Sequence, residues 1–315
     1  MSRRRRLLAA VVSAALVVAV ISYGVSALNL QSIRAEPSHE VSATPSVDPS
    51  DESTSSQSPT PAATTPTPQG APYRRKLPTK STQGFKHLAG QDFDEDAKVG
   101  QVASRDREAD LPYQDWILPY ANWSGHRGGQ YRFMENVSVR DGKLDVHVRS
   151  IKGKNTGAAW IWLHPDPTFK NYGFTYGAVE QRVKVVGEIP GYGVANLLWP
   201  DSEDWGDGEI DFPEAGFGEE PTAYHHCLSP RPKDNCSIFR TGVTWSEWHV
   251  YRIEWLPTGT SYYIDGRLIG TNTDATPHTS HHWVTQIARD TKGRKDPRLQ
   301  GHYLIDWVRF ETVQN

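Results

Sequence analysis

The sequence predicts an all-β protein whose folded part is a sandwich of two packed antiparallel sheets. Three observations favour this class. Short segments rich in β-branched and aromatic residues, most of them alternating, fill the chain from about residue 84 to its end. Turn signals separate them, and Asp265-Gly266 between SYYI and RLIG is a strong hairpin signal. No long segment there has the 3.6-residue period of an amphipathic helix.

Six segments carry the strongest strand signal. They are, in chain order, Lys143–Arg149, Ala158–Leu163, Gly177–Val185, Trp248–Glu254, Ser261–Ile264 and His302–Phe310. Every tryptophan lies after residue 115. A folded region of roughly 230 residues suits one all-β domain, so we predict a single domain over residues 84–315.

The N-terminal segment, residues 1–34, has the pattern of an export signal. Four arginines, Arg3 to Arg6, precede an uncharged and largely apolar run, and Val25-Ser26-Ala27 fits a small-residue cleavage site. A run of this length also suits a membrane-spanning helix, which needs roughly 20 residues. Both alternatives stay open: a cleaved signal peptide, or an anchor that tethers the protein through residues 7–27. Either way we expect the rest to be extracellular or on the outer face of the cytoplasmic membrane.

Residues 35–83 are predicted to be a disordered linker. Between residues 36 and 72 the chain consists mainly of Ser, Thr, Pro and Ala with a few acids, and it has no apolar cluster to bury. The formal net charge of −3 argues against a nucleic-acid partner. We expect a monomer that requires no cofactor.

Cys227 and Cys236 are the only cysteines. In an exported chain such a pair favours a disulfide, which would contribute about 2–3 kcal/mol to stability. The neighbouring His225 and His226 suggest a zinc site as well. However, adjacent residues of a strand point to opposite faces, so we do not expect both histidines to bind one ion.

The stretch GEIDFPEAG, residues 208–216, places three acids close together. In a strand, Glu209 and Asp211 would share one face while the apolar residues between them point to the core. Strict alternation would turn Glu214 toward the core, but one extra residue, a β-bulge, returns it to the face of the other two acids. Pro213 favours a bulge because proline cannot donate to a sheet ladder.

Three carboxylates on one face repel one another, which indicates a functional use. A retaining glycosidase needs two carboxyl groups about 5–5.5 Å apart, one as nucleophile and one as general acid. Glu209 and Glu214 fit that pair if their side chains lean together, and Asp211 would raise the pKa of Glu214 and orient Glu209. A calcium site or a solvated acidic patch stay open as alternatives because four more acids lie just upstream. They are Asp201, Glu203, Asp204 and Asp207.

The acidic motif and its flanking segments resemble glycoside hydrolase family 16, the laminarinase and lichenase family. GEIDFPE matches the bulged form of the family's motif, Glu-x-Asp-x-x-Glu. Other segments resemble the family's strands in the expected order and together cover about residues 84–315. They are Gly90–Phe93, Val137–Leu144, Tyr176–Lys184, Trp248–Trp255, Tyr263–Gly266 and Ile305–Phe310.

The resemblance implies a jelly-roll sandwich with a long substrate cleft on its concave face. It also implies a retaining endo-β-glycosidase acting on a β-linked polysaccharide, most simply β-1,3- or mixed-linkage β-glucan. Glu209 would be the nucleophile, Glu214 the acid/base, and Asp211 the acid that assists between them. The alternative is a non-catalytic carbohydrate-binding jelly roll of the cell envelope, which need not keep both glutamates.

Four further residues are candidate substrate contacts. Trp205 lies where the family often has a cleft tryptophan, and flat aromatic rings stack on the apolar faces of sugars. Trp199 is displaced from the family's usual position, and core packing is an alternative of at least equal weight. His225 matches a strand histidine that faces the family's cleft, and Gln286 is a candidate for hydrogen bonds to sugar. Asp306 could help to bind a structural calcium, as in some relatives.

Overall fold

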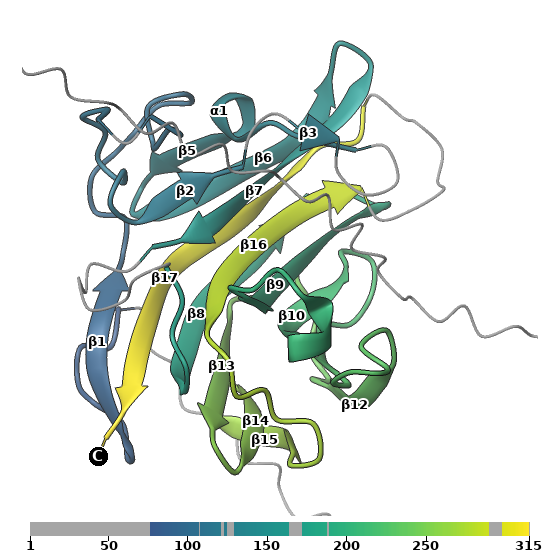
Figure 1. Ribbon diagram of the computed structural model, residues 1–315. Coiled ribbons are helices and arrows are strands. Elements are labelled where there is room, and N and C mark those ends of the chain that lie inside the picture. Colours follow the sequence, from purple (N-terminus) through teal and green to yellow (C-terminus); the bar gives the residue numbers. More distant parts are fainter. Residues whose placement is uncertain are drawn as a thin grey trace, which may run out of the picture. The chain divides into compact units, whose positions relative to one another are not determined.

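The folded part of the protein is almost entirely β-structure, as the sequence predicts (Figure 1). The computed structural model describes residues 76–106, 108–120, 123–124, 129–163, 172–187, 189–289 and 298–314. The predicted export segment and nearly all of the predicted linker lie outside the described residues. None of the helices that the structure describes is long and apolar enough to span a membrane.

One sheet, here called the motif sheet, carries the acidic motif. Its strands are antiparallel neighbours in the order β2-β7-β16-β9-β10-β11-β12. Their bounds are β2 Ile117–Pro119, β7 Lys154–Trp162, β16 His281–Arg289, β9 Tyr192–Pro200, β10 Ile210–Gly216, β11 Thr222–His226 and β12 Asn235–Arg240.

The second sheet, here called the back sheet, runs β5-β6-β17-β8-β13-β14-β15, and β1 pairs with the far end of β17. In Figure 1, β16 crosses in front of β17 and β8. The bounds are β1 Phe85–Gln91, β5 Val137–Arg140, β6 Lys143–Ile151, β8 Gly177–Val186, β13 His249–Leu256, β14 Gly259–Ile264, β15 Arg267–Asn272 and β17 Gly301–Val313.

Short elements join the two sheets at one end. A ladder of β4 (Gln130–Tyr131) with β3 (Trp123–Ser124) and β7 continues into the pairing of β6 with β7. The helices are α1 (Phe133–Asn136) and the single-turn η2 (Trp205–Asp207), which comes just before the acidic motif.

The main core lies between the sheets and is built from the inward-facing side of each strand. Alternate residues of β8, such as Val179 and Val183, are buried against residues of the motif sheet such as Trp283 and Ile210. A second, smaller cluster forms around Leu197. This cluster belongs to the opposite face of the motif sheet, because its members alternate with core residues along β9.

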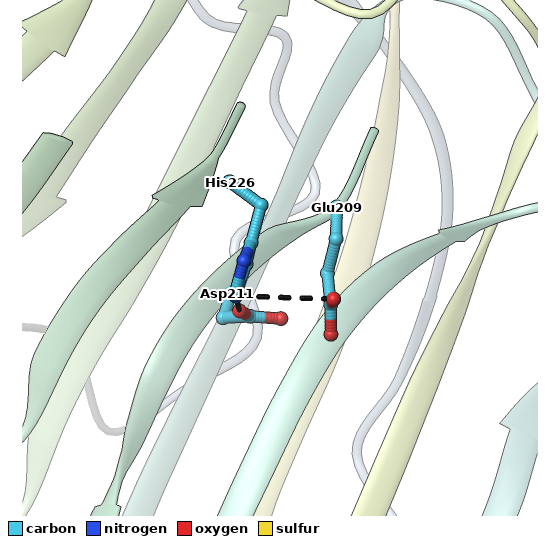
Figure 2. Close-up of side chains that lie close together, drawn as sticks. All are labelled: Glu209, Asp211 and His226. Atoms are coloured by element: carbon cyan, nitrogen blue, oxygen red, sulfur yellow. Dashed lines mark ion pairs between the residues drawn. The ribbon is translucent and has the colours of Figure 1, made fainter. Parts of the chain in front are cut away.

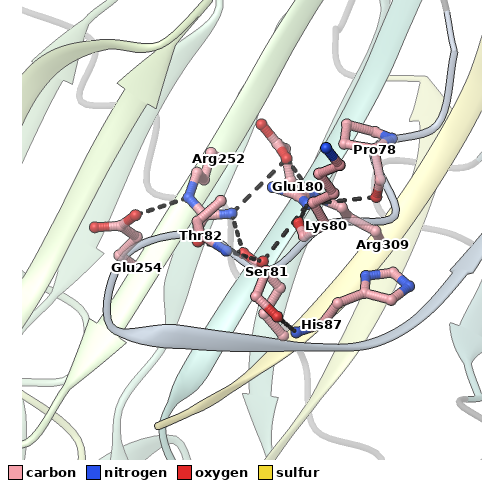
Figure 3. Close-up of polar contacts among 10 residues, drawn as sticks. Pro78, Lys80, Ser81, Thr82, His87, Glu180, Arg252, Glu254 and Arg309 are labelled. Carbon is pink, nitrogen blue, oxygen red and sulfur yellow. Dashed lines mark hydrogen bonds and ion pairs between the residues drawn. The ribbon is translucent and has the colours of Figure 1, made fainter.

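A segment that the sequence assigns to the linker packs against side chains on the outer face of the back sheet (Figure 3). Arg309 donates to the carbonyl of Lys80 at 3.1 Å, and Arg252 donates to Oγ1 of Thr82 at 2.9 Å. The two arginines also contact Glu180. We call residues 78–82 the strap. Ordered contacts therefore begin before residue 84, the boundary expected from composition.

The strap and the sheet bury a balanced set of charges. Glu180, Arg309 and Glu311 are 1–3% exposed, and Arg252 is 6% exposed. Glu180 lies directly opposite Arg252 on one neighbouring strand and Arg309 on the other. Arg252 also lies 2.5 Å from Glu311. Two positive and two negative side chains thus compensate each other in a site with little water.

Candidate active site

The predicted β-bulge is present in β10 at the acidic motif. Asp211 lies opposite Leu197 of β9 and Glu214 lies opposite Ala195, so three steps along β10 match two steps along β9. The register against β11 shifts at the same place. Since Ala195 and Leu197 are alternate residues on one face of β9, Asp211 and Glu214 share that face as well.

Glu209 extends the same row of acids. It comes directly before β10, and its carbonyl accepts a hydrogen bond from the His226 amide at 3.1 Å. Because Ile210 pairs with Leu198, continuing this register places Glu209 opposite Trp199. All three acids therefore lie on the face of the motif sheet that points away from the main core.

Glu209 and Asp211 form a tight group with His226 of β11 (Figure 2). The Nε2 atom of His226 lies 3.2 Å from Oδ2 of Asp211 and 3.8 Å from Oε2 of Glu209. Glu209 is 3% exposed, Asp211 1% and His226 7%. We call these three residues the buried trio.

The environment of Glu209 disfavours its charged form. Burial raises its pKa well above the ordinary value, and the nearby charge of Asp211 raises it further. The positive charge of His226 and the indole N–H of Trp205 act in the opposite direction. The histidine is therefore the group that favours ionisation of Glu209.

The two carboxylates hold His226 in its charged form. Burial alone would lower its pKa, but contact with Asp211 and the charges of Asp211 and Glu209 outweigh burial and raise the pKa to about 9. On the other side of the ring, Nδ1 lies 3.1 Å from the carbonyl oxygen of Pro232. Pro232 belongs to the loop closed by the predicted Cys227–Cys236 disulfide, which the structure contains, with 5.0 Å between the Cα atoms.

We expect the protein to lose stability as the pH rises from 6.5 to 9. The folded-state pKa of His226, about 9, lies above its ordinary value of 6.5, so folding favours proton binding at this group. The contribution is fully present below pH 6.5 and is lost as the pH rises through 9. It amounts to about 3 kcal/mol. The raised pKa of Glu209 acts in the same direction.

The measurement is the melting temperature across this pH range for the wild type, His226→Gln and His278→Gln. The wild type and the exposed His278→Gln control should show the same alkaline decrease, and His226→Gln should show a flatter curve. Parallel curves for all three proteins would contradict the prediction.

Glu214 lies apart from the buried trio, beyond the bulge. It is only partly buried. Tyr224 of β11 lies directly opposite Asp211, and the pKa of its hydroxyl is raised first by burial and then by the charge of Glu214. Tyr224 is thus a further neighbour of the acids, and the sequence analysis did not select it.

The structure corrects the expected position of His225. Its Nδ1 lies 2.7 Å from the Tyr262 hydroxyl and its Nε2 lies 2.9 Å from the Ala275 carbonyl oxygen, so the ring is buried away from the acids. Burial lowers its pKa to about 4. The reason is strand alternation: His225 pairs with Ile210, which faces the core, and His226 takes the position beside the acids.

The two candidate tryptophans lie next to the buried trio. The ring of Trp205 lies 5.6 Å from that of His226 and 6.4 Å from that of Trp199. Trp199 is nearly buried in the smaller apolar cluster, and its indole donates to Glu203 at 2.9 Å. Its packing role is therefore clear, while contact of either ring with a sugar stays a prediction.

The other two candidates occupy different parts of the sandwich. Gln286 lies opposite Ala195, in the row of Glu214, and is 4% exposed; its Oε1 accepts a hydrogen bond from the Tyr131 hydroxyl at 3.2 Å. Asp306 lies on the back sheet and pairs with Arg182 at 2.5 Å. An arginine already compensates the charge of Asp306, and its role in calcium binding stays a prediction.

The family comparison agrees with the acidic motif. The model of the family described as glycosyl hydrolases family 16 matches residues 167–309. These residues form a glycosyl hydrolase family 16 domain. The matched range contains the bulged motif and β11, and the enzyme class predicted from the sequence, a glycoside hydrolase, is confirmed.

Solved structures of this family share the fold. A variant of LamA from Z. galactanivorans, in complex with laminaritriose and laminaritetraose, is 20% identical, with a TM-score of 0.54 over 72% of this chain and 98% of that one. The laminarinase catalytic domain from Thermotoga maritima MSB8 is 18% identical, with a TM-score of 0.55 over 73% and 99%. A mutant of SCLam, a non-specific endo-β-1,3(4)-glucanase of family 16, is 16% identical, with a TM-score of 0.57 over 75% and 98%.

These structural similarities show a common fold, so the predicted sandwich of the family 16 jelly-roll type is confirmed. No curated protein sequence is similar enough to this chain to count as a match.

Proposed function

We propose that the protein is a retaining endo-β-glycosidase that cleaves β-1,3- or mixed-linkage β-glucan, with Glu209 as nucleophile and Glu214 as acid/base. The observation that carries the proposal is the bulge in β10. It turns Glu214 to the face of Glu209 and Asp211, on a sheet that belongs to a family 16 domain. A purely structural strand would gain nothing from three acids on one face.

The mechanism needs one ionised and one protonated carboxyl group on either side of the glycosidic bond. In the first step, the Glu209 carboxylate forms a bond to the anomeric carbon while Glu214 gives its proton to the departing glycosidic oxygen. In the second step, a water molecule gives a proton to Glu214, and its oxygen replaces Glu209 at the anomeric carbon. The sugar keeps its anomeric configuration because two displacements occur.

Within the buried trio, His226 opposes the rise in the pKa of the proposed nucleophile Glu209. Burial and Asp211 both favour the protonated carboxyl group, which cannot attack. His226 carries a positive charge at neutral pH and lies 3.8 Å from Glu209, so it favours the carboxylate. Asp211 lies 3.2 Å from the imidazole and holds it in place.

The substrate class is supported by what is printed of the structural neighbours. One is in complex with laminari-oligosaccharides, one is a laminarinase catalytic domain, and one is an endo-β-1,3(4)-glucanase. These proteins are 16–20% identical to this chain, so they support the substrate class. The experiment below decides which glycosidic linkage is cleaved.

The full chain should release reducing sugar from laminarin or mixed-linkage β-glucan and leave agarose, carrageenan and xyloglucan intact. The measurement is reducing-end release on this panel, with proton NMR of the first product to show retention. Release from a galactan alone would overturn the substrate, and an inverted product would overturn the mechanism. Binding of laminarin without hydrolysis would favour a non-catalytic carbohydrate-binding protein.

A further inference from the structure

The buried trio presents metal-ligand atoms to a single point. Glu209, Asp211 and His226 each offer one ligand atom, and these atoms all lie within 4.8 Å of one another (Figure 2). Within the described ranges of the chain, no other group of three such side chains meets this condition. The ligands come from two neighbouring segments of a rigid sheet, so their spacing is set by the strand register.

Carboxylate oxygens of the buried trio can accept further hydrogen bonds or bind a cation. Both oxygens of Asp211 and Oε2 of Glu209 accept no hydrogen bond from the described residues, although the two side chains are 1% and 3% exposed. Their close partner is the His226 ring, at ion-pair distance. Buried acceptors without donors are costly. A cation that replaces the His226 Nε2 proton and bonds these oxygens directly would therefore be bound favourably.

The spacing of the ligand atoms suits a tetrahedral ion. Bonds of about 2.0–2.1 Å to nitrogen and oxygen place neighbouring ligands of a tetrahedral zinc ion about 3.3 Å apart. The His226 Nε2 atom lies 3.2 Å from Asp211 and 3.8 Å from Glu209, and the three ligand atoms lie within 4.8 Å of one another, so no pair needs to close by more than about 1.5 Å. Calcium needs six to eight oxygen ligands and magnesium a near-ideal octahedron, and a donor set of two carboxylates and one imidazole supplies neither.

The histidine is oriented as metal-binding histidines usually are. Its Nδ1 atom lies 3.1 Å from the Pro232 carbonyl oxygen, which keeps a proton on Nδ1 and turns Nε2 toward the carboxylates. A metal ion that binds Nε2 replaces the proton that this atom carries at neutral pH, and that proton is released to solvent. The Cys227–Cys236 disulfide closes the loop that supplies this carbonyl. Ring orientation is thus determined before any ion arrives.

We propose that Glu209, Asp211 and His226 form a zinc-binding site with three protein ligands and a fourth position open to water or to a sugar hydroxyl. Zn²⁺ bound there occupies the carboxylate that would attack the substrate. Zinc is therefore an inhibitor that competes with substrate. This consequence rests on the proposed hydrolysis, whereas binding of the ion does not.

Cobalt(II) tests the geometry on the unaltered full chain. Co²⁺ added to the metal-free protein should give the intense visible absorption of a four-coordinate ion, and one equivalent of Zn²⁺ should remove it. The weak absorption of six-coordinate Co²⁺, unchanged by Zn²⁺, would overturn the proposal.

Zinc calorimetry tests the ligands. His226→Gln should weaken Zn²⁺ binding at least about 100-fold, since loss of an outer partner of a metal ligand alone costs 10- to 100-fold. The matched control is His302→Gln on the back sheet. Its ring stacks on His147 with 4.5 Å between centroids and bonds Asp145, which makes it the strongest competing place for an ion. Unchanged affinity in His226→Gln, or lost affinity in His302→Gln, would contradict the assignment.

Inhibition is measured separately on laminarin. Zn²⁺ should raise the apparent KM and leave kcat unchanged, while Mg²⁺ and Ca²⁺ at the same concentration have no effect. Hydrolysis that is insensitive to saturating Zn²⁺ would overturn the site. If the protein hydrolyses nothing on the panel, the proposed function fails alone, and the cobalt and calorimetric results decide the zinc site.

Discussion

The Glu209→Gln variant should lose hydrolysis of the preferred β-glucan by on the order of 10⁴-fold in kcat. The amide has nearly the shape of the carboxyl group, so it keeps the packing beside Trp205 and His226, but it cannot form the covalent bond to sugar. Removing one of two adjacent buried carboxylates also relieves repulsion. Stability should therefore rise or stay unchanged while activity disappears. Reducing-end assays and a melting curve on the same preparation check both parts.

Two further variants separate the roles of the acids. Glu214→Gln should also be inactive on polysaccharide, yet it should still form the glycosyl-enzyme from an aryl glycoside whose leaving group needs no proton. Glu219→Gln, an exposed glutamate close in the chain, is the matched control and should keep wild-type activity. Activity of Glu209→Gln on the aryl glycoside would show that another residue is the nucleophile.

Arg309→Met should destabilise the folded protein by about 3 kcal/mol or more. Arg309 is 3% exposed, contacts Glu180 directly and donates to the carbonyl of Lys80 in the strap. Without it, Glu180 loses its 2.5 Å ion pair, and Arg252 lies farther away, at 3.7 Å. Breaking a buried charge network on one side typically costs 3–5 kcal/mol because the remaining charge is left uncompensated. For a domain of this size the melting temperature should fall by roughly 10 °C.

The control for this variant is Arg231→Met. Arg231 pairs with Asp234 at 3.6 Å, but the two side chains are 69% and 58% exposed. Exposed ion pairs contribute about 0–1 kcal/mol, so this variant should melt within a few degrees of the wild type. Equal shifts for both variants would mean that the strap network adds no more stability than a surface pair.

The position of the acids could be predicted because strand alternation depends on neighbours along the chain. Spacing alone placed Glu209 and Asp211 together, and Pro213 indicated the extra residue that brings Glu214 back to their face. The structure contains that extra residue relative to both neighbouring strands. The disulfide could likewise be predicted because its two cysteines lie only nine positions apart in the chain.

The choice between His225 and His226 depends on the register between β10 and β11, and a shift of one residue reverses the faces. The resemblance suggested His225. Once the register is known the choice follows, because His225 lies opposite Ile210 and must face the core with it.

The strap could not be found from composition. Residues 76–83 have the polar and proline-containing character of the linker before them. The side chains that hold the strap lie far away in the chain: Arg252 is 170 positions from Thr82, and Arg309 is 229 positions from Lys80. Order in this segment is imposed by tertiary contacts, so local sequence carries no sign of it.

The strap has a consequence for how the protein can diversify. It packs on the outer face of the back sheet, while the acids lie on the outer face of the motif sheet, and the two sheets are themselves about 10 Å apart. Substitutions at such distances usually have additive effects. Mutations around the acids can therefore change which polysaccharide binds, while the strap and the core keep the protein folded. A lineage could exchange one polysaccharide for another on this scaffold without first acquiring compensating changes elsewhere.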